Sequence, residues 1–464
     1  MQLSHVCQHW RNIAIANTLL WTHLHPQNLK LTVFCLERAK GSKLSIGICA
    51  GTLGFRCCGI QPDTEDTNPG IYDLTRVLMP NVSALWVFPV ASNILQLLDI
   101  FRSYPAPSLQ SITIHLSQLL ADPEQMFNED DMYDKIREGF LSQSLFLDTT
   151  PRLCQAHSFG FSPHPSSTMW NNMTHIAISF TRLEGLLPPD SPGLSLPLQL
   201  EDWFSILQRS PSLEKLEINY HSLLSDVSLG QRILQKGPVL MRKLKRISFT
   251  CVSLTEILLF LYAIDAPQLA GLGVFITEEE LTMNLNHFFM ACPILFARLR
   301  NLREFACDEH QADKIMVNAL AGGDESQPPL PLCQLLLVFP KAVPQWESHF
   351  ARYMGTLREL SLHAFPIQAL PPLPRLETLY LSTPMPSLQE VKAQIGVCPL
   401  ERIILPRLAS PLERDQLDAI ECLFTGSKVR EIHFREDDWE ASSEDAIDSL
   451  EEFSGHIDAE LFTF

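Results

Sequence analysis

A spacing of apolar residues at positions i, i+3 and i+5 recurs along most of the chain. In residues 357–362 it is formed by Leu357, Leu360 and Leu362, with Ser361 between the last two. This alternation is typical of a half-buried strand, and the first leucine would lie in the turn that leads into it. Twelve further copies therefore predict short strands, and they begin at Val82, Leu109, Leu153, Met173, Leu213, Leu244, Leu269, Leu302, Leu332, Leu376, Leu400 and Val429.

Prolines precede several of these predicted strands. A proline lies two residues before the first apolar position at Pro107, Pro151, Pro211, Pro267 and Pro374. Because proline ends a helix and favours an extended segment, this placement predicts a helix that stops just before the strand.

Apolar residues at helical spacing occupy the segments between the predicted strands. Ile94, Leu97, Leu98 and Phe101 fall on one face of a helix that Ser92 would cap. Similar faces occur within residues 200–207, 255–262, 281–289, 350–354, 388–395 and 417–424. We expect the aromatic and methionine residues of these faces to belong to the core. Strands and helices in alternation predict an α/β protein with parallel strands.

The repeat has a mean step of about 29 residues between Val82 and Val429. These units resemble irregular leucine-rich repeats over roughly residues 79–435, although the asparagine or cysteine that usually follows the strand is mostly missing. The resemblance implies an irregular leucine-rich-repeat solenoid, in which parallel strands alternate with helices. The alternative is an ordinary α/β domain with several buried strands.

The N-terminal residues show a second pattern. Leu3, Val6, Cys7, Trp10 and Ile13 fall on one face of a helix, and Leu20-Trp21 follows. The pairs Val-Cys, Trp-Arg and Leu-Trp at this spacing resemble the second half of an F-box. The resemblance implies that these five residues and Trp21 either bind a Skp1-type adaptor or pack as a cap on the solenoid.

An F-box begins with a leucine-proline turn and a first helix, and this chain starts too late to contain them. We expect either that the true start lies upstream of Met1 or that the adaptor contact is lost. Further along, residues 31–39 predict a short helix and residues 44–48 a strand. Leu36-Glu37-Arg38 resembles a motif of the F-box-like proteins that are abundant in mushroom-forming fungi.

Composition and these patterns predict four regions. They are a partial F-box-like cap at 1–50, a Gly- and Pro-rich loop at 51–78, the repeats at 79–435, and an acidic cap or tail at 436–464. Insertions at 118–150 and 184–199 interrupt the repeats. In the acidic region, residues 436–460 carry eleven Asp and Glu and no Lys or Arg.

Charge and cysteine content restrict the partners and the compartment. The chain has 35 Lys and Arg against 53 Asp and Glu and shows no basic stripe, so we expect neither nucleic-acid nor membrane binding. Its twelve cysteines form no C-x-x-C pair, and the N-terminus lacks a signal-peptide pattern. We therefore expect a cytoplasmic or nuclear protein, or one present in both.

Catalytic and metal-binding motifs are missing from the sequence. It contains no G-x-S-x-G, Gly-rich phosphate loop, H-E-x-x-H or paired-cysteine zinc spacing. His23 and His25 predict a turn rather than a metal site, and Asp308-Glu309-His310 predicts a solvated strand end. We expect no enzyme activity, no metal and no cofactor, although an unrecognised catalytic site is a remaining alternative.

The strand pattern leaves the residues between the buried positions on a face that could bind a partner. Aromatic and histidine side chains gather at its N-terminal end, and we expect Trp86, Phe88, His115, His157 and Phe159 to bind a target protein. Alternatively, another segment covers them. The resemblances imply a non-catalytic substrate-recognition subunit of a Skp1–cullin–F-box ubiquitin ligase. The alternative is a ligase-independent interaction scaffold, and the sequence does not identify the target.

Overall fold

The computed structural model describes twelve segments of the chain. They comprise most of residues 12–49, 70–88, 94–116, 145–179, 198–219 and 237–275, and the shorter segments 301–308, 334–338, 356–363, 373–381, 401–406 and 431–435. The chain divides into two compact units, Met1–Pro331 and Leu332–Phe464. Each unit is described by itself below.

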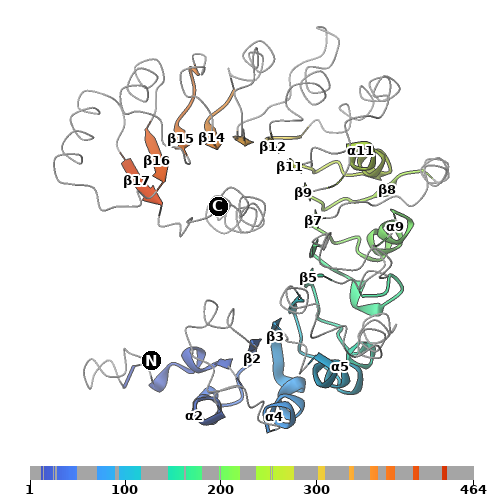
Figure 1. The fold of residues 1–464 in the computed structure, drawn as a ribbon, viewed down its shortest axis with the longest axis vertical. Helices are drawn as coiled ribbons and strands as arrows, with labels where there is room; N and C mark the ends of the chain where they lie inside the picture. Colours follow the sequence, from blue (N-terminus) through green and yellow to red (C-terminus); the bar gives the residue numbers. More distant parts are fainter. Residues whose placement is uncertain are drawn as a thin grey trace, which may run out of the picture. The chain divides into compact units, whose positions relative to one another are not determined.

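The first unit is built on a sheet of parallel strands that lie side by side in chain order (Figure 1). The strands are β1 (His23–Leu24), β2 (Leu44–Cys49), β3 (Val82–Phe88), β4 (Ser111–His115), β5 (Gln155–Phe159), β6 (His175–Ser179), β7 (Lys215–Asn219), β9 (Arg246–Thr250), β11 (Gly271–Phe275) and β12 (Glu304–Asp308). A separate parallel pair is formed by β8 (Val239–Leu240) and β10 (Ile264–Asp265).

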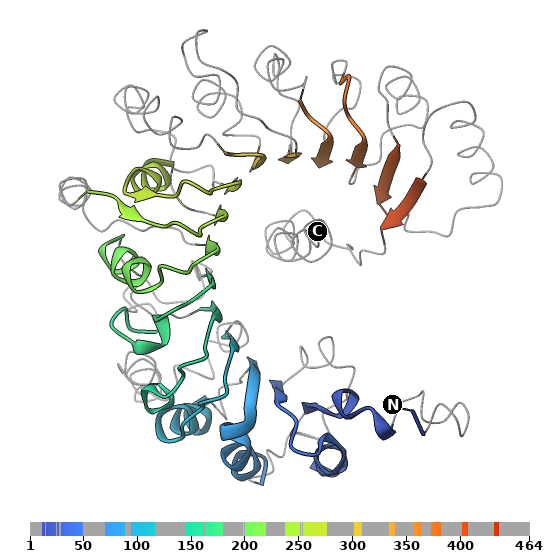
Figure 2. The same ribbon diagram turned by 180° about the vertical axis from the view of Figure 1, so that it is seen from behind.

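The helices of the first unit lie on one side of this sheet, as Figures 1 and 2 show. They are α2 (Leu29–Ala39), α4 (Gly70–Leu78), α5 (Ile94–Ser103), α9 (Leu200–Arg209) and α11 (Leu254–Tyr262). Short 3-10 helices occur at η2 (Thr18–Trp21), η3 (Met79–Asn81), η4 (Phe146–Asp148) and η5 (Thr168–Trp170). We refer to the opposite side of the sheet as the open face.

The second unit repeats the parallel arrangement. Its strands are β13 (Gln334–Val338), β14 (Glu359–His363), β15 (Thr378–Leu381), β16 (Arg402–Pro406) and β17 (Glu431–Arg435), each paired with the next in the chain. Leu360, Leu379, Ile403 and Ile432 are successive partners in the register. The middle position of the sequence motif is therefore aligned from strand to strand.

The same alignment organises the core of the first unit. Leu85, Ile112, Ala156, Ile176, Leu216, Ile247, Leu272 and Phe305 follow one another across the sheet as register partners. Of these, the residues from Leu85 to Leu272 are at most 4% exposed. Because every strand contributes an apolar side chain at the same level, the core is a continuous row rather than a set of separate clusters.

A repeated turn explains the prolines before the strands. The amide of Leu109 donates to the carbonyl of Ala106 (3.1 Å), and Leu213 and Leu269 donate in the same way to Ser210 and Ala266 (3.0 Å each). In each case the proline occupies the second position of the turn, where its restricted φ is favourable. The proline thus stops the preceding segment and also prepares the entry of the strand.

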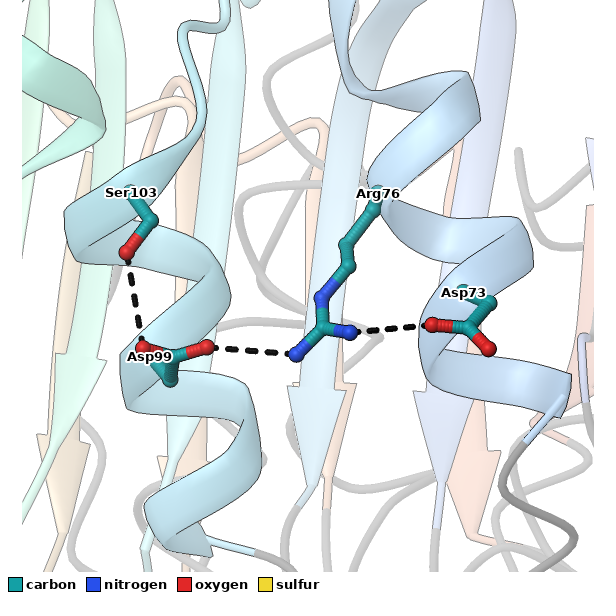
Figure 3. Close-up of polar contacts among 4 residues, drawn as sticks. All are labelled: Asp73, Arg76, Asp99 and Ser103. Atoms are coloured by element: carbon teal, nitrogen blue, oxygen red, sulfur yellow. Dashed lines mark hydrogen bonds and ion pairs between the residues drawn. The ribbon is translucent and has the colours of Figure 1, made fainter.

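Adjacent helices are joined by an ion-pair network (Figure 3). Arg76 of α4 contacts Asp73 of the same helix (Nη1 to Oδ1, 2.9 Å) and Asp99 of α5 (Nη2 to Oδ2, 3.2 Å). Ser103 donates from Oγ to the other oxygen of Asp99 at 3.4 Å. Since the carboxylates are mostly exposed, the network adds little stability, but it links neighbouring repeats in a defined orientation.

The structure confirms an α/β protein in which a large parallel sheet alternates with helices. Every predicted strand is present, and the helices predicted near residues 31–39, 94–101, 200–207 and 255–262 correspond to α2, α5, α9 and α11. In α11 the buried side chains include Ile257, Phe260 and Leu261. The helices predicted within 281–289, 350–354, 388–395 and 417–424, and residues 436–464, lie outside the described residues, as do most of the two insertions.

Two predictions near the N-terminus were wrong. Helix α4 occupies Gly70–Leu78, the end of the range 51–78 that was predicted to be a loop, while residues 51–69 lie outside the described residues. Tyr72 and Leu78 of α4 are buried, so its apolar face decides its structure despite the nearby glycines and prolines. His23 lies in β1 rather than in a turn, because this short segment pairs with β2.

Candidate binding surface

The open face carries the side chains that alternate with the buried row. In β4, β5, β7 and β9 the first, third and fifth residues are half-buried, while the second and fourth are buried. Because alternate side chains of a strand point to opposite faces, the half-buried residues share the face that the described helices leave uncovered. They are the structural basis of a candidate binding surface.

Three rings on this face form a row that we term the aromatic ladder: Phe88 of β3, His115 of β4 and Phe159 of β5. The ring centroids of Phe88 and His115 are 5.5 Å apart with an interplanar angle of 25°. Those of His115 and Phe159 are 4.2 Å apart at 28°. Stacked rings at these distances stabilise one another beyond the burial of their area, so the ladder is a preorganised apolar element.

A second row of rings lies beside the ladder. Trp86 and His157 sit two residues before Phe88 and Phe159 on the same strands, and both are half-buried. The Trp86 ring also lies 6.3 Å from the ring of His23 on β1, with an interplanar angle of 30°. The structure therefore brings together all five predicted target-binding residues, Trp86, Phe88, His115, His157 and Phe159, on three neighbouring strands.

Burial favours the neutral form of three histidines on this surface. It lowers the pKa of His115 from 6.5 to about 4. Burial also lowers the pKa of His157, an effect that Glu217 opposes and Lys215 reinforces. The pKa of His175 on β6 is lowered mainly by burial and then by Lys215. At neutral pH these three histidines, His115, His157 and His175, are therefore uncharged.

The neighbouring strands carry charges that are paired with one another. On β7, Lys215 and Glu217 form an ion pair of 2.7 Å. Arg246 of β9 reaches Glu304 of β12 across the intervening strand β11, with Nε and Oε2 3.2 Å apart.

Gly271 of β11 makes the longer ion pair possible. It is the register partner of both Arg246 and Glu304. A Cβ at position 271 would lie 3.0 Å from Cγ of Arg246 and 3.0 Å from Oε2 of Glu304. The absence of a side chain therefore lets the arginine cross the strand, and the charges compensate each other within the face.

The other predicted site, at the N-terminus, separates into a packed and an exposed part. Trp21 is 4% exposed and packs edge-on against Phe34 of α2, with centroids 5.5 Å apart. The guanidinium carbon of Arg38 lies 3.3 Å from the Phe34 centroid and 5.5 Å from that of Trp21. Trp21 is therefore a packing residue that joins η2 to α2.

Large apolar side chains around Trp21 remain exposed. Seven of the ten exposed large hydrophobic residues recorded in the described segments lie between positions 13 and 34, and we term them the N-terminal apolar surface: Ile13, Ile15, Leu19, Leu20, Leu29, Val33 and Phe34. Leu19 is 69% exposed and Leu20 52%. The turn that presents them is capped by Asn17, whose Oδ1 accepts from the Leu19 amide at 3.2 Å.

The sequence predicted Ile13 and Trp21 as site residues but missed the other exposed members of this surface. Ile13 is 43% exposed, whereas Leu3, Val6, Cys7 and Trp10 lie outside the described residues. The pair Leu19-Leu20 could have indicated this exposure, because two adjacent apolar residues in a short turn are difficult to bury together.

Catalytic and metal-binding arrangements do not emerge from the described segments. Among these residues no group of three or more His, Cys, Asp and Glu could hold a metal ion. Of the triplet Asp308-Glu309-His310, only Asp308 is described, at the end of β12. A pocket of about 450 Å³ lies between α9 and β8, and Glu201 is the only acidic or basic side chain among its described lining residues.

None of the helices in the described part of the chain combines the length and the apolar character needed to cross a bilayer. No model of a known protein family matches the sequence, and no curated protein matches it.

Proposed function

We propose that this chain is a non-catalytic substrate-recognition subunit of a Skp1–cullin–F-box type ubiquitin ligase. The observation that carries the proposal is the N-terminal apolar surface, four of whose seven residues, Ile13, Ile15, Leu19 and Leu20, lie within the F-box-like sequence. Proteins rarely leave a cluster of large apolar side chains exposed unless a partner covers it. A Skp1-type adaptor is the partner that the F-box resemblance implies.

The two parts of the N-terminal site suit different roles in this proposal. Trp21 and Arg38 hold η2 against α2, and the amide of Ser45 on β2 donates to the carbonyl of Thr22 at 2.9 Å. These contacts anchor the segment to the first strands. Leu19 and Leu20 would then project from a supported turn, which reduces the entropy lost when the adaptor binds.

Replacing both Leu19 and Leu20 by Ser should strongly reduce adaptor retention. Two exposed leucines at the centre of an apolar interface would supply enough binding free energy that their loss lowers the retained adaptor by at least about tenfold. The measurement is co-purification of a tagged chain with the Skp1-type adaptor, quantified against the chain itself. Thermal unfolding should be almost unchanged, because both side chains are already exposed.

Val77→Ser is the matched control for this experiment. Val77 is 73% exposed on α4, outside the N-terminal apolar surface, so its replacement should leave adaptor retention intact. Wild-type retention by the Leu19→Ser/Leu20→Ser variant would contradict the assignment. The ligase proposal fails if neither this chain nor a form extended upstream of Met1 by a leucine-proline helix retains the adaptor.

The open face of β3, β4 and β5 would hold the target. Replacing both Trp86 and Phe88 by Ala should reduce target capture by at least about tenfold without unfolding the protein, because half-buried aromatic residues are the usual anchors of interfaces. The readout is the quantity of each co-purifying protein, measured by mass spectrometry for wild type and variant. Thr250→Ala on β9 serves as the control. Collapse of the thermal transition would instead assign Trp86 and Phe88 to the core.

A ligase-independent scaffold is the second candidate. It is favoured by the burial of Trp21, which is the behaviour expected of an F-box remnant that only caps the sheet. The adaptor experiment separates the two candidates. A chain that captures its target through Trp86 and Phe88 but never retains the adaptor would be a scaffold.

A further inference from the structure

The register of β3, β4 and β5 places a short side chain between two rings. Thr113 is paired with Trp86 on one side and with His157 on the other. His115 of the aromatic ladder lies two residues further along β4, on the same face. Neighbouring strands are about 4.8 Å apart. The short threonine side chain therefore projects less far from the sheet than the tryptophan and histidine side chains on either side of it.

The other half-buried residues of β4 do not share this environment. Ser111 is paired with Ala84 and Gln155 rather than with rings. His115 is itself part of the ladder and stacks with Phe159. Thr113, itself half-buried, is therefore the position on this strand where an additional side chain would meet aromatic surfaces on three sides.

We propose that Thr113 is a specificity-determining residue, over which the target places one uncharged apolar side chain between Trp86 and His157. This inference rests on the target-binding role proposed above for the open face. The incoming group would contact the indole of Trp86, the imidazole of His157 and the ladder ring of His115. A leucine, methionine or phenylalanine side chain has the size and the apolar character that these rings favour.

The charges around Thr113 favour an uncharged target segment. A cationic or anionic target group would lose its hydration at this surface and would find the histidines neutral. On β7, Lys215 and Glu217 already pair with each other, as do Arg246 and Glu304 further along the sheet. A charged target group would compete with these existing pairs, whereas an apolar one leaves them intact.

The test is a selection of random peptides on the full-length chain at neutral pH, followed by affinity measurements on the enriched sequences. Binding of each labelled peptide is measured by fluorescence anisotropy for wild type, Thr113→Trp and Thr113→Leu. Filling the position should weaken binding by at least about tenfold, because the incoming side chain loses its contact area. Thr250→Trp is the matched control, since Thr250 is half-buried on the same face of β9, and it should change affinity less than about twofold.

The proposal expects enriched peptides that share an apolar residue whose replacement by Ala or Asp removes binding. It is overturned if these peptides bind Thr113→Trp and Thr113→Leu as tightly as wild type, if they require an Asp, Glu, Lys or Arg, or if no peptide is enriched. Thermal unfolding of both Thr113 variants verifies folding, and the leucine variant decides the question should the tryptophan variant unfold.

Adaptor retention, measured on the same preparations, keeps this inference separate from the proposed function. If substitutions at Thr113 leave peptide binding unchanged while the adaptor is still retained, only the role of Thr113 is overturned. Thr113-dependent binding supports the inference even where neither this chain nor the form extended upstream of Met1 retains the adaptor, a result that refutes only the ligase.

Discussion

Replacing Phe260 by Ala is expected to lower the free energy of unfolding by about 3–5 kcal/mol, the usual cost of removing a fully buried phenylalanine. Phe260 of α11 is 0% exposed and is surrounded by other rings. Its centroid lies 5.4 Å from that of Phe249 on β9, 5.9 Å from Phe204 and 6.4 Å from Trp203, both on α9. The side chain therefore joins helices α9 and α11 to strand β9, and alanine would leave a cavity that none of them can fill alone.

The effect should be local as well as large. In a stack of repeats each unit contacts mainly its neighbours, so the loss should concentrate on α9, β9 and α11. Hydrogen exchange measured by mass spectrometry should show faster exchange in these elements and little change in β3 and β4. Urea unfolding gives the total loss, and Val77→Ala, at a site that is 73% exposed, should change it by less than about 0.5 kcal/mol. Uniformly faster exchange across the whole unit would contradict this neighbour-limited packing.

Acidification is the second change with a large expected effect. The pKa of His115 is about 4 in the folded protein, against 6.5 for an unperturbed histidine, because burial disfavours the imidazolium. Below pH 6.5 the unfolded chain binds a proton at this residue that the folded chain excludes until about pH 4. The contribution to stability is therefore complete above pH 6.5 and is lost as the pH falls through this window.

We expect His115 alone to account for about 2–3 kcal/mol of lost unfolding free energy. This value is below the full equivalent of its pKa shift because the ring remains partly exposed to solvent. His157 and His175 have pKa values lowered in the same direction and should add to it. The measurement is the urea midpoint at neutral pH and at about pH 4.5. His115→Phe is the informative variant, because a phenylalanine keeps a ring between Phe88 and Phe159 and cannot be protonated.

The variant should retain stability at neutral pH and lose less of it in acid than wild type does. Protonation of carboxylates affects both proteins equally, so the difference between them isolates the histidine. If wild type and His115→Phe lose the same stability in acid, the ladder ring is not the residue that resists protonation.

The strand pattern was readable because burial along a single strand has a period of two. Leu213, Leu216 and Ile218 are all buried, and their spacing alone indicated β7. Helix α4 was missed because the preceding glycines and prolines dominated the composition. Tyr72 and Leu78 are buried only because neighbouring elements are present to receive them.

For the binding surfaces too, the sequence indicated some features and only the structure showed the others. The sequence identified Trp86, Phe88, His115, His157 and Phe159 as candidates, since alternation places them opposite the buried row. It gave no indication that Phe88, His115 and Phe159 stack, that Thr113 lies between Trp86 and His157, or that Arg246 crosses Gly271 to reach Glu304. Nor did it show that Trp21 is buried while Leu19 and Leu20 are exposed.

The amino-acid sequence by itself determined the strands, several of the helices between them and the face on which each strand residue lies, because these depend on periodicities within a short segment. Only the tertiary structure decided which side chains of different strands become neighbours. That choice depends on the register between strands that are tens of residues apart in the chain. It determines the aromatic ladder, the compensated charges and the position of Thr113.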